Sequence, residues 1–272
     1  MLKRICFIAT ALLKLVTGKV AEMWKNALLG VGFLTALLIK PECFRQCHEN
    51  ITYSMVDADN IPLDHKLVNI LNSSNGIFIE VGALDGNEIS NTKLFEEFYG
   101  WTGVLIEPSP NLFARLCANR PNSRCFQCAL GSFEEDETYA YGDFDGHPMA
   151  SLVGSAERPP TVRVLIRSLQ SILDECGIGH VHFFSLDTEG YELNILKGID
   201  FSKTTFDYLL IEIYKHQFDD IVEFLKEQGY DLISCFSNYN VISNPGWDGM
   251  HNDYLFKRRA LDLLQAESCK DC

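Results

Sequence analysis

Hydrophobic and polar positions alternate in blocks along the chain from Gly76 onward. Short apolar runs bounded by turn residues predict buried strands, and between them apolar residues recur at helical spacing. Strand-like and helix-like blocks in alternation are typical of a parallel α/β sheet with helices on its faces. The pattern predicts seven core strands, over residues 77–81, 103–107, 124–129, 180–186, 208–213, 230–236 and 253–257.

The segments between these strands carry helix signals. Ser168 is a good N-cap for one predicted helix, and Gly229 ends another. The last strand follows the loop 243–252 without a helix, as an antiparallel strand allows, because it needs no crossover. A polar loop over 132–160 is a candidate lid, and 161–166 is predicted to be an extra extended segment. The predicted helices cover residues 91–99, 111–119, 169–176 and 216–228, with a further helix after Glu189.

Composition divides the chain into four parts. Residues 1–40 form a basic, hydrophobic N-terminal segment, and residues 41–75 form a polar connector that contains one short helix-like stretch. The α/β pattern then occupies residues 76–258, and residues 259–272 form a C-terminal tail. We therefore expect one catalytic or binding domain with a separate N-terminal element.

The N-terminal segment contains an uncharged apolar run of 13 residues, 27–39, and a bilayer span needs about 20 apolar residues. Three interpretations remain open: a signal-anchor helix over 20–39, a cleaved signal peptide, or a helix that lies on a membrane surface or packs in a core. If the segment is an anchor, the basic residues before Ala27 favour a cytoplasmic N-terminus. We then expect a single-pass protein with its body in the lumen of the endoplasmic reticulum or Golgi; the alternative is a cytoplasmic body.

The charge is spread unevenly over the chain. Residues 1–40 carry six basic residues against Glu22 alone, a balance of +5, whereas the whole chain carries −14. The remaining residues therefore sum to −19 (−14 minus +5). A body this acidic repels a phosphate backbone, so we expect no nucleic-acid partner.

Cysteines and sequons bear on the compartment. Cys125 and Cys128 lie in one predicted strand and point to opposite faces, so this pair does not form half of a zinc site, and the sequence assigns no metal. The chain has ten cysteines, which would be compatible with disulfides in an oxidising compartment. Asn50 and Asn72 begin glycosylation sequons, which agree with a lumenal body.

The turn after the first strand carries the first candidate chemistry. Glycines at positions 82 and 86 let the backbone approach a ligand at the carboxyl edge of the sheet. Position 84 is Leu, so the second glycine of a dinucleotide fingerprint is missing. Glu80 and Asp85 would repel a pyrophosphate and favour a cofactor that bears an ammonium and a sulfonium. S-adenosyl-L-methionine is such a cofactor.

The second predicted strand ends in Glu107, which is followed by Pro108. A carboxylate at this place can accept both hydrogen bonds from a ribose diol. The order of strand, glycine turn, helix, strand and terminal acid indicates a nucleoside-containing cofactor.

These motifs resemble the FkbM family of methyltransferases. The resemblance spans about residues 64–258, and it includes Glu212 in the fifth predicted strand. Glu80 departs from the family pattern, which commonly has Asp at that place. The segments that carry the resemblance are 79–86, 90–92, 100–108, 186–192 and 196–198.

The resemblance implies a Rossmann-like, seven-stranded class I methyltransferase sheet whose last strand is antiparallel. It also implies S-adenosyl-L-methionine as cofactor and O-methylation, often of a hydroxyl on a sugar or another small molecule. The cofactor-binding residues that we expect are Glu80, Gly82, Asp85, Gly86, Asn91, Glu107, Ala129 and Asp187.

Methyl transfer to a hydroxyl requires alignment of the acceptor and usually a general base or a metal. Asp187, at the end of the fourth strand, is expected to face the methyl group. Glu189 and Glu212 could join it as a base or as magnesium ligands, or they could instead cap a helix and pair with a lysine. His216 and His147 are further candidates for the base, or surface histidines.

A second function remains open. The arrangement of a membrane segment before such a domain is similar to that of the Star protein, so a catalytically inactive, membrane-anchored trafficking or interaction protein is the alternative. The presence of Gly82, Asp85, Gly86, Glu107 and Asp187 favours catalysis. No motif in the sequence identifies the acceptor, whether it is a glycan or another small molecule.

Overall fold

The computed structural model describes residues 51–152, 159–242, 244–245 and 247–260. The chain divides into two units, Met1–Ile51 and Thr52–Cys272, and the description below concerns the second. The anchor predicted over 20–39 lies outside the described residues. Within them, no helix combines the length and the apolar character that crossing a bilayer requires.

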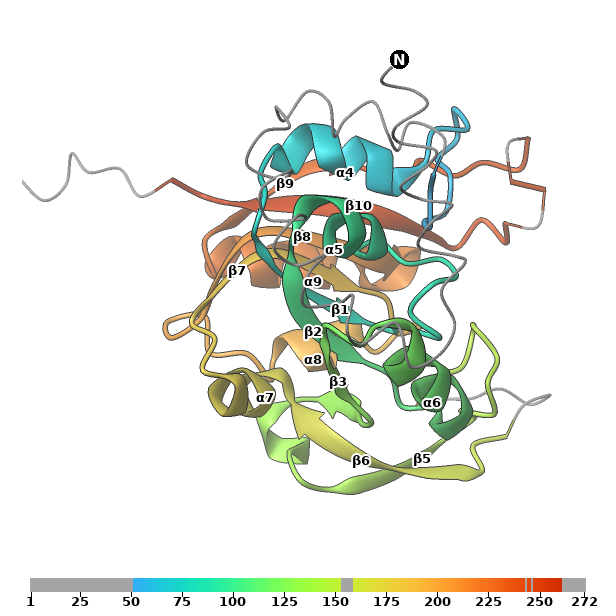
Figure 1. The fold of residues 1–272 in the computed structure, drawn as a ribbon, viewed down its shortest axis with the longest axis vertical. Coiled ribbons are helices and arrows are strands. Elements are labelled where there is room, and N and C mark those ends of the chain that lie inside the picture. Colours follow the sequence, from blue (N-terminus) through green and yellow to red (C-terminus); the bar gives the residue numbers. More distant parts are fainter. Residues whose placement is uncertain (1–50, 153–158, 243, 246, 261–272) are drawn as a thin grey trace, which may run out of the picture. The chain divides into compact units, whose positions relative to one another are not determined.

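A seven-stranded sheet forms the centre of the described part of the chain (Figure 1). Its strand order is β3-β2-β1-β7-β8-β10-β9. Pairing is parallel from β3 through to β8, whereas β10 is antiparallel to both β8 and β9. The predicted sheet with an antiparallel last strand is therefore confirmed. The strands are β1 Ile77–Val81, β2 Thr102–Ile106, β3 Arg124–Phe126, β7 His180–Leu186, β8 Thr205–Tyr214, β9 Tyr230–Cys235 and β10 His251–Arg258.

One predicted strand is wrong in extent. The segment 124–129 was expected as a single strand, but the chain leaves the main sheet after Phe126. It then forms β4, Ala129–Gly131, in a second sheet of order β4-β6-β5 with β6 Val162–Ser168 and β5 Tyr139–Gly142. Both halves are apolar enough to be strands, so the local pattern could not show that they pair with different partners.

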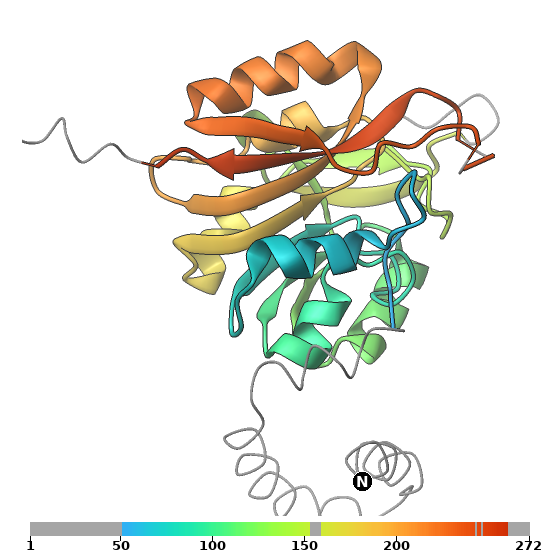
Figure 2. The same cartoon turned by 90° about the horizontal axis from the view of Figure 1, so that it is seen from above.

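Helices cover both faces of the main sheet (Figure 2). Along β1, Ile79 and Val81 pack with the cluster that includes α7, α8 and α9, whereas Phe78 packs with α4, α5 and α6. This alternation follows from the period of two along a strand. The helices are α4 Leu63–Leu71, α5 Lys93–Tyr99, α6 Pro110–Asn119, α7 Leu169–Cys176, α8 Glu192–Leu196 and α9 Phe218–Glu227, with short 3₁₀ helices at Phe133–Glu135 and Lys215–Gln217.

The helix ends show why the sequence forms these elements. Ser168 caps α7 as predicted, because its hydroxyl accepts a hydrogen bond from the amide of Ser171 at 3.2 Å. Ser109 caps α6 in the same way, and Pro110 occupies the first helical turn, where its missing amide proton costs nothing. The helix predicted over 91–99 begins at Lys93, because the residues before it are bonded to a buried carboxylate described below.

Part of the segment expected as a connector belongs to the folded body. Leu63 and Leu67 of α4 are buried in the same cluster as Phe236. Lys66 reinforces this attachment with an ion pair of 2.9 Å to Asp57 and a hydrogen bond to the carbonyl oxygen of Phe236. The helix α4 therefore packs over β8 and β10, on the face of the sheet that also carries α5 (Figures 1 and 2).

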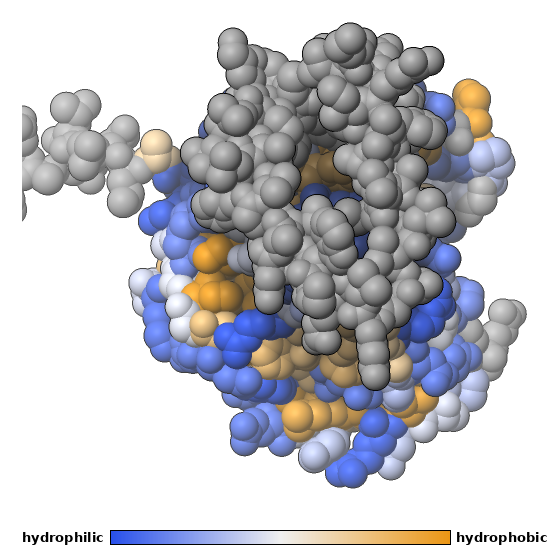
Figure 3. Space-filling model, viewed as in Figure 1, coloured by the Kyte–Doolittle hydropathy of each residue, from blue (hydrophilic) through white to orange (hydrophobic). Residues whose placement is uncertain are grey.

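The strands β1, β2, β7 and β8 end at one edge of the sheet because they are parallel. Ligands of open α/β sheets bind at this carboxyl edge. The small second sheet lies at the lower end of the face seen in Figure 3, where apolar residues are visible among polar ones. The fold thus brings the predicted site residues to one edge.

Candidate active site

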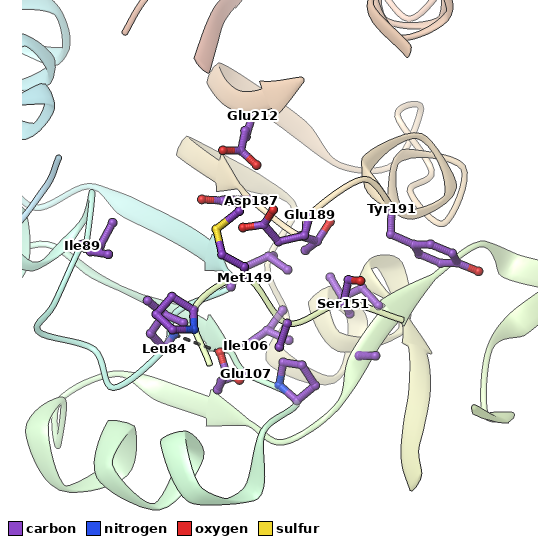
Figure 4. Close-up of a pocket in the computed structure, with 18 of the residues that line it drawn as sticks. Leu84, Ile89, Ile106, Glu107, Met149, Ser151, Asp187, Glu189, Tyr191 and Glu212 are labelled. Carbon is purple, nitrogen blue, oxygen red and sulfur yellow. Dashed lines mark hydrogen bonds between the residues drawn. The ribbon is translucent and has the colours of Figure 1, made fainter. Parts of the chain in front are cut away.

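A pocket opens at the carboxyl edge of the sheet (Figure 4). The strand ends contribute its polar side chains, and residues 147–152 of the predicted lid contribute part of its wall. Five of the eight expected cofactor-binding residues line it: Gly82, Asn91, Glu107, Ala129 and Asp187.

The glycine turn packs closely against the neighbouring strand end. Gly82 has φ +79°, in the left-handed region, and a Cβ added there would lie 2.0 Å from the carbonyl oxygen of Asp187. The amides of Gly82 and Ala83 both donate to the carbonyl oxygen of Ile106 at 3.1 Å. Only glycine allows this approach, which opens the sheet edge to a ligand.

Glu107 occupies the place expected for an acid that binds ribose. Its side chain is buried, and its two carboxylate oxygens accept hydrogen bonds from the amides of Leu84 at 3.0 Å and Ser109 at 2.8 Å. Each oxygen keeps a second lone pair, so the carboxylate is oriented but not saturated. Burial raises the pKa of Glu107 to about 7, although the hydrogen bonds from these two amides lower it in part.

Glu80 is turned away from the pocket and organises the loop behind it. It accepts hydrogen bonds from the hydroxyls of Ser90 at 2.9 Å and Thr92 at 2.6 Å and from the amide of Asn91 at 2.7 Å. The buried guanidinium of Arg120 lies 3.7 Å from Glu80 and 2.6 Å from Glu96, so the two carboxylates share its positive charge. Glu80 therefore fixes the segment that presents Asn91 to the pocket.

Asp85 has a similar structural task. It accepts from the amides of Asn87 at 3.0 Å and Glu88 at 2.9 Å and forms an ion pair with Arg115. Gly86, with φ +78°, leaves room for the packed side chain of Leu116, 2.6 Å from where its Cβ would lie. Since Glu80 and Asp85 are engaged by these contacts and do not line the pocket, the charge offered to a ligand comes from other carboxylates.

Those carboxylates are Asp187, Glu189 and Glu212, which lie at the adjacent ends of β7 and β8. Their ligand oxygens all lie within 4.8 Å of one another. In Figure 4 they gather on one side of the pocket, and Glu107 lies on the opposite side beside Leu84. We call these three residues the carboxylate cluster.

Burial and mutual repulsion perturb two members of the carboxylate cluster, Asp187 and Glu212. Burial and the charge of Glu189 raise the pKa of Asp187 well above its ordinary value, and burial and Asp187 raise that of Glu212. Tyr214 donates a hydrogen bond of 2.7 Å to Glu189, and Asp253 adds further negative charge. A carboxylate whose pKa is raised accepts a proton more readily than an exposed one.

Hydrogen bonds to the buried carboxylate of Glu192 stabilise the turn that carries Glu189. Glu189 has φ +57°, a left-handed conformation that costs a residue with a side chain about 1–2 kcal/mol. Glu192 stabilises it, because one carboxylate oxygen accepts from the amide and hydroxyl of Thr188, both at 2.9 Å, and from the amide of Gly190 at 3.1 Å. The side chain of Glu189 is thereby aimed into the pocket (Figure 4).

The histidine that lines this side of the pocket is not His216. His216 is exposed in the 3₁₀ helix after β8, whereas His251, at the start of β10, lines the pocket. Nε2 of His251 lies 3.5 Å from Oε1 of Glu212. His147 of the predicted lid also lines the pocket.

Asp253 and Tyr239 line the pocket together with His251, and no sequence motif marks these three residues. The antiparallel register of β10 on β8 pairs Asp253 with Glu212. The prediction of an antiparallel last strand contained this signal, since the start of such a strand lies beside the end of its neighbour.

The open side of the pocket is apolar. Met55, Ile89 and Met149 line it while keeping 41%, 42% and 40% of their surfaces exposed. Large apolar side chains exposed together at the rim of a pocket indicate a ligand with an apolar part.

Comparison with known proteins gives the family. The sequence model of the methyltransferase FkbM domain matches residues 80–232, more than half of the chain. The chain belongs to the FkbM methyltransferase family. A search among curated proteins finds no match.

Three solved methyltransferase structures with a similar fold are distant in sequence. A TehB-like S-adenosylmethionine-dependent methyltransferase from Corynebacterium glutamicum is 10% identical, with a TM-score of 0.40 over 72% of this chain and 88% of that one. Precorrin-6y C5,15-methyltransferase from Geobacter metallireducens is 9% identical, with a TM-score of 0.43 over 76% and 100%. Fibrillarin from Aeropyrum pernix, with S-adenosyl-L-methionine bound, is 10% identical, with a TM-score of 0.40 over 68% and 67%. At these TM-scores no residue role is transferred.

The cofactor of the FkbM family, S-adenosyl-L-methionine, fits the residues of this pocket. Glu107 offers a lone pair on each oxygen to a ribose diol, and Gly82 leaves the turn open beside it. The carboxylate cluster provides negative charge for an ammonium or a sulfonium. Leu84 stands where a pyrophosphate-binding turn has its second glycine.

Proposed function

We propose that the chain transfers a methyl group from S-adenosyl-L-methionine to a hydroxyl oxygen of a small molecule or glycan. The observation that carries this proposal is that Glu107 and the carboxylate cluster open into one pocket from opposite sides. The cofactor supplies an electrophilic methyl group on a sulfonium, whose sulfur keeps the bonding electrons as the methyl leaves. A hydroxyl oxygen of the acceptor forms the new bond, and its proton must be taken up nearby.

The carboxylate cluster is suited to take up that proton. Asp187 lies beside the glycine turn, because its backbone carbonyl is the group that approaches Gly82. Burial and the negative charge of Glu189 raise its pKa, which makes Asp187 a stronger proton acceptor than an exposed carboxylate. Tyr214 holds the neighbouring carboxylate of Glu189 in place through its hydrogen bond. We assign Asp187 as the first proton acceptor.

The pocket also favours a class of acceptor. Its apolar rim, formed by Met55, Ile89 and Met149, suits a hydroxylated compound with an apolar part. The basic side chains among the described lining residues are two histidines, with neither lysine nor arginine. Together with the acidic body, this lining argues against a nucleic-acid acceptor.

The test is a methyl-transfer assay with the full chain, labelled S-adenosyl-L-methionine and a panel of hydroxylated acceptors. Asp187→Asn should lower kcat by about 10²-fold or more, the usual contribution of a general base. Glu223→Gln, on the exposed surface of α9, removes one charge elsewhere and should keep full activity. Product analysis must find a methoxy carbon; a methyl group on nitrogen or carbon would reject O-methylation.

A further inference from the structure

The carboxylate cluster has the composition of a site for a hard cation. It offers three carboxylate oxygens within 4.8 Å of one another, from the turn after β7 and the end of β8. Mg²⁺ and Mn²⁺ prefer oxygen ligands of this kind and keep further positions for water or substrate oxygens. The arrangement leaves the pocket side open for such additional ligands.

An independent observation at Glu212 points to a missing partner. The residue is 8% exposed, and among the described residues no donor group reaches its Oε2. The neighbouring Asp187 is itself a carboxyl group, so the two can share a hydrogen bond only while one of them is protonated. Its other oxygen has His251 at 3.5 Å, beyond a good hydrogen bond. A buried carboxylate oxygen without a partner is costly, and a bound cation removes that cost.

We propose that Asp187, Glu189 and Glu212 hold a divalent cation, Mg²⁺ or Mn²⁺, that binds the acceptor oxygen. This inference rests on the proposed function, since the cation would lie where we place the acceptor hydroxyl. A bound cation lowers the pKa of the oxygen that it coordinates, which supports removal of the hydroxyl proton. Each carboxylate gives one oxygen to the cation, so the second oxygen of Asp187 is left to accept the hydroxyl proton. The site would then position the acceptor as well as activate it.

A second cluster of possible metal ligands among the described residues does not support a cation site. His180, His182 and Asp207 lie together at the opposite edge of the sheet. Nδ1 of His182 accepts a hydrogen bond of 3.0 Å from the amide of Ile77, so Nε2 carries the proton of the neutral ring. That ring has no lone pair left for a metal, which leaves two ligands. The carboxylate cluster has no such conflict.

The positive groups of the cofactor could also compensate the cluster, so binding must be measured with and without cofactor. Calorimetric titration of the full chain with Mn²⁺ is the experiment, repeated in saturating S-adenosylhomocysteine, whose sulfur is neutral. We expect one saturable site per chain in both conditions. Glu212→Gln and Glu189→Gln should weaken Mn²⁺ binding at least about tenfold, whereas the charge-matched control Glu223→Gln should not.

The two proposals fail in different ways. If wild type shows no saturable Mn²⁺ binding at millimolar concentration, or if Glu212→Gln binds as tightly as wild type, the cation site is refuted. Normal S-adenosylhomocysteine binding and activity in metal-free buffer would then leave the proposed methyl transfer intact. Absence of S-adenosylhomocysteine binding with intact Mn²⁺ binding would instead refute the proposed function. Since Gln has the shape of Glu and removes repulsion, the variants are expected to fold.

Discussion

The ionisation of Glu107 should control cofactor affinity in the neutral pH range. A ribose diol donates to the ionised carboxylate, but burial raises the pKa of Glu107 to about 7. Cofactor binding therefore requires the loss of a proton from part of the free protein. With a pKa of about 7, the ionised fraction rises about tenfold between pH 6 and pH 8. The affinity for S-adenosylhomocysteine should rise by the same factor.

Glu107→Gln isolates this contribution. At about pH 8 the variant should bind S-adenosylhomocysteine roughly ten- to a hundred-fold more weakly, because a charged acceptor is worth about 1.5–3 kcal/mol. At about pH 6 most wild-type protein is protonated at Glu107, so the ratio of the two dissociation constants should shrink about tenfold. Other groups that titrate, including the ligand's amine and the carboxylate cluster, affect both proteins and cancel in the ratio.

The assay is calorimetric titration at several pH values, in two buffers with different ionisation enthalpies. When it binds S-adenosylhomocysteine at pH 7, wild type should release about half a proton more than Glu107→Gln, because Glu107 is half ionised in the free protein at that pH. A ratio of dissociation constants that stays constant from pH 6 to pH 8 would refute the assigned ionisation. A ratio near one at every pH would refute the contact with ribose itself.

Three further predictions concern stability and location. Burial and repulsion raise the pKa of Glu212 in the folded chain above its ordinary value of 4.5, so the folded chain keeps a proton that the unfolded chain releases. The free energy of unfolding should therefore fall as the pH rises above about 4.5. Glu212→Gln should flatten this fall, and in metal-free buffer at about pH 8 the variant should have a higher Tm than wild type. Gly82→Ala should lower the Tm more than Gly229→Ala: both have a left-handed φ, worth about 1–2 kcal/mol, but only Gly82 also meets a backbone atom at 2.0 Å. Equal losses would contradict the close approach. If the body is lumenal, the exposed Asn72 should carry a glycan. A glycosidase-sensitive mass shift should then disappear in the double variant Asn72→Gln and Asn50→Gln. An unglycosylated protein whose body is digested by protease in intact microsomes would place the body in the cytosol.

Local patterns were enough to predict most of the fold. The runs that became β1, β7 and β8 are apolar, short and bounded by turn residues, and Ser168 marks the start of α7. These signals lie within a few residues, so they need no knowledge of distant partners. The strand predicted over 124–129 failed for the opposite reason, because its two halves choose different sheets through contacts with β2 and β6.

The site divides in the same way. The sequence placed Gly82, Glu107, Asp187 and Glu212 at strand ends, and parallel strands bring such ends to one edge. It could not show that Glu80 and its neighbours form an internal scaffold, since Arg120, which packs beside Glu80, lies 40 residues further along the chain.

The sequence by itself determined the α/β alternation, the glycine turn and the acid that ends the second strand, because each is encoded by residues close together. The tertiary structure decided which carboxylates face the pocket and which are neutralised inside the fold. It also brought His251 beside Glu212 through the antiparallel register of β10 on β8. Contacts of this kind depend on packing between distant segments, where the burial of charge, and not a local pattern, determines the partners.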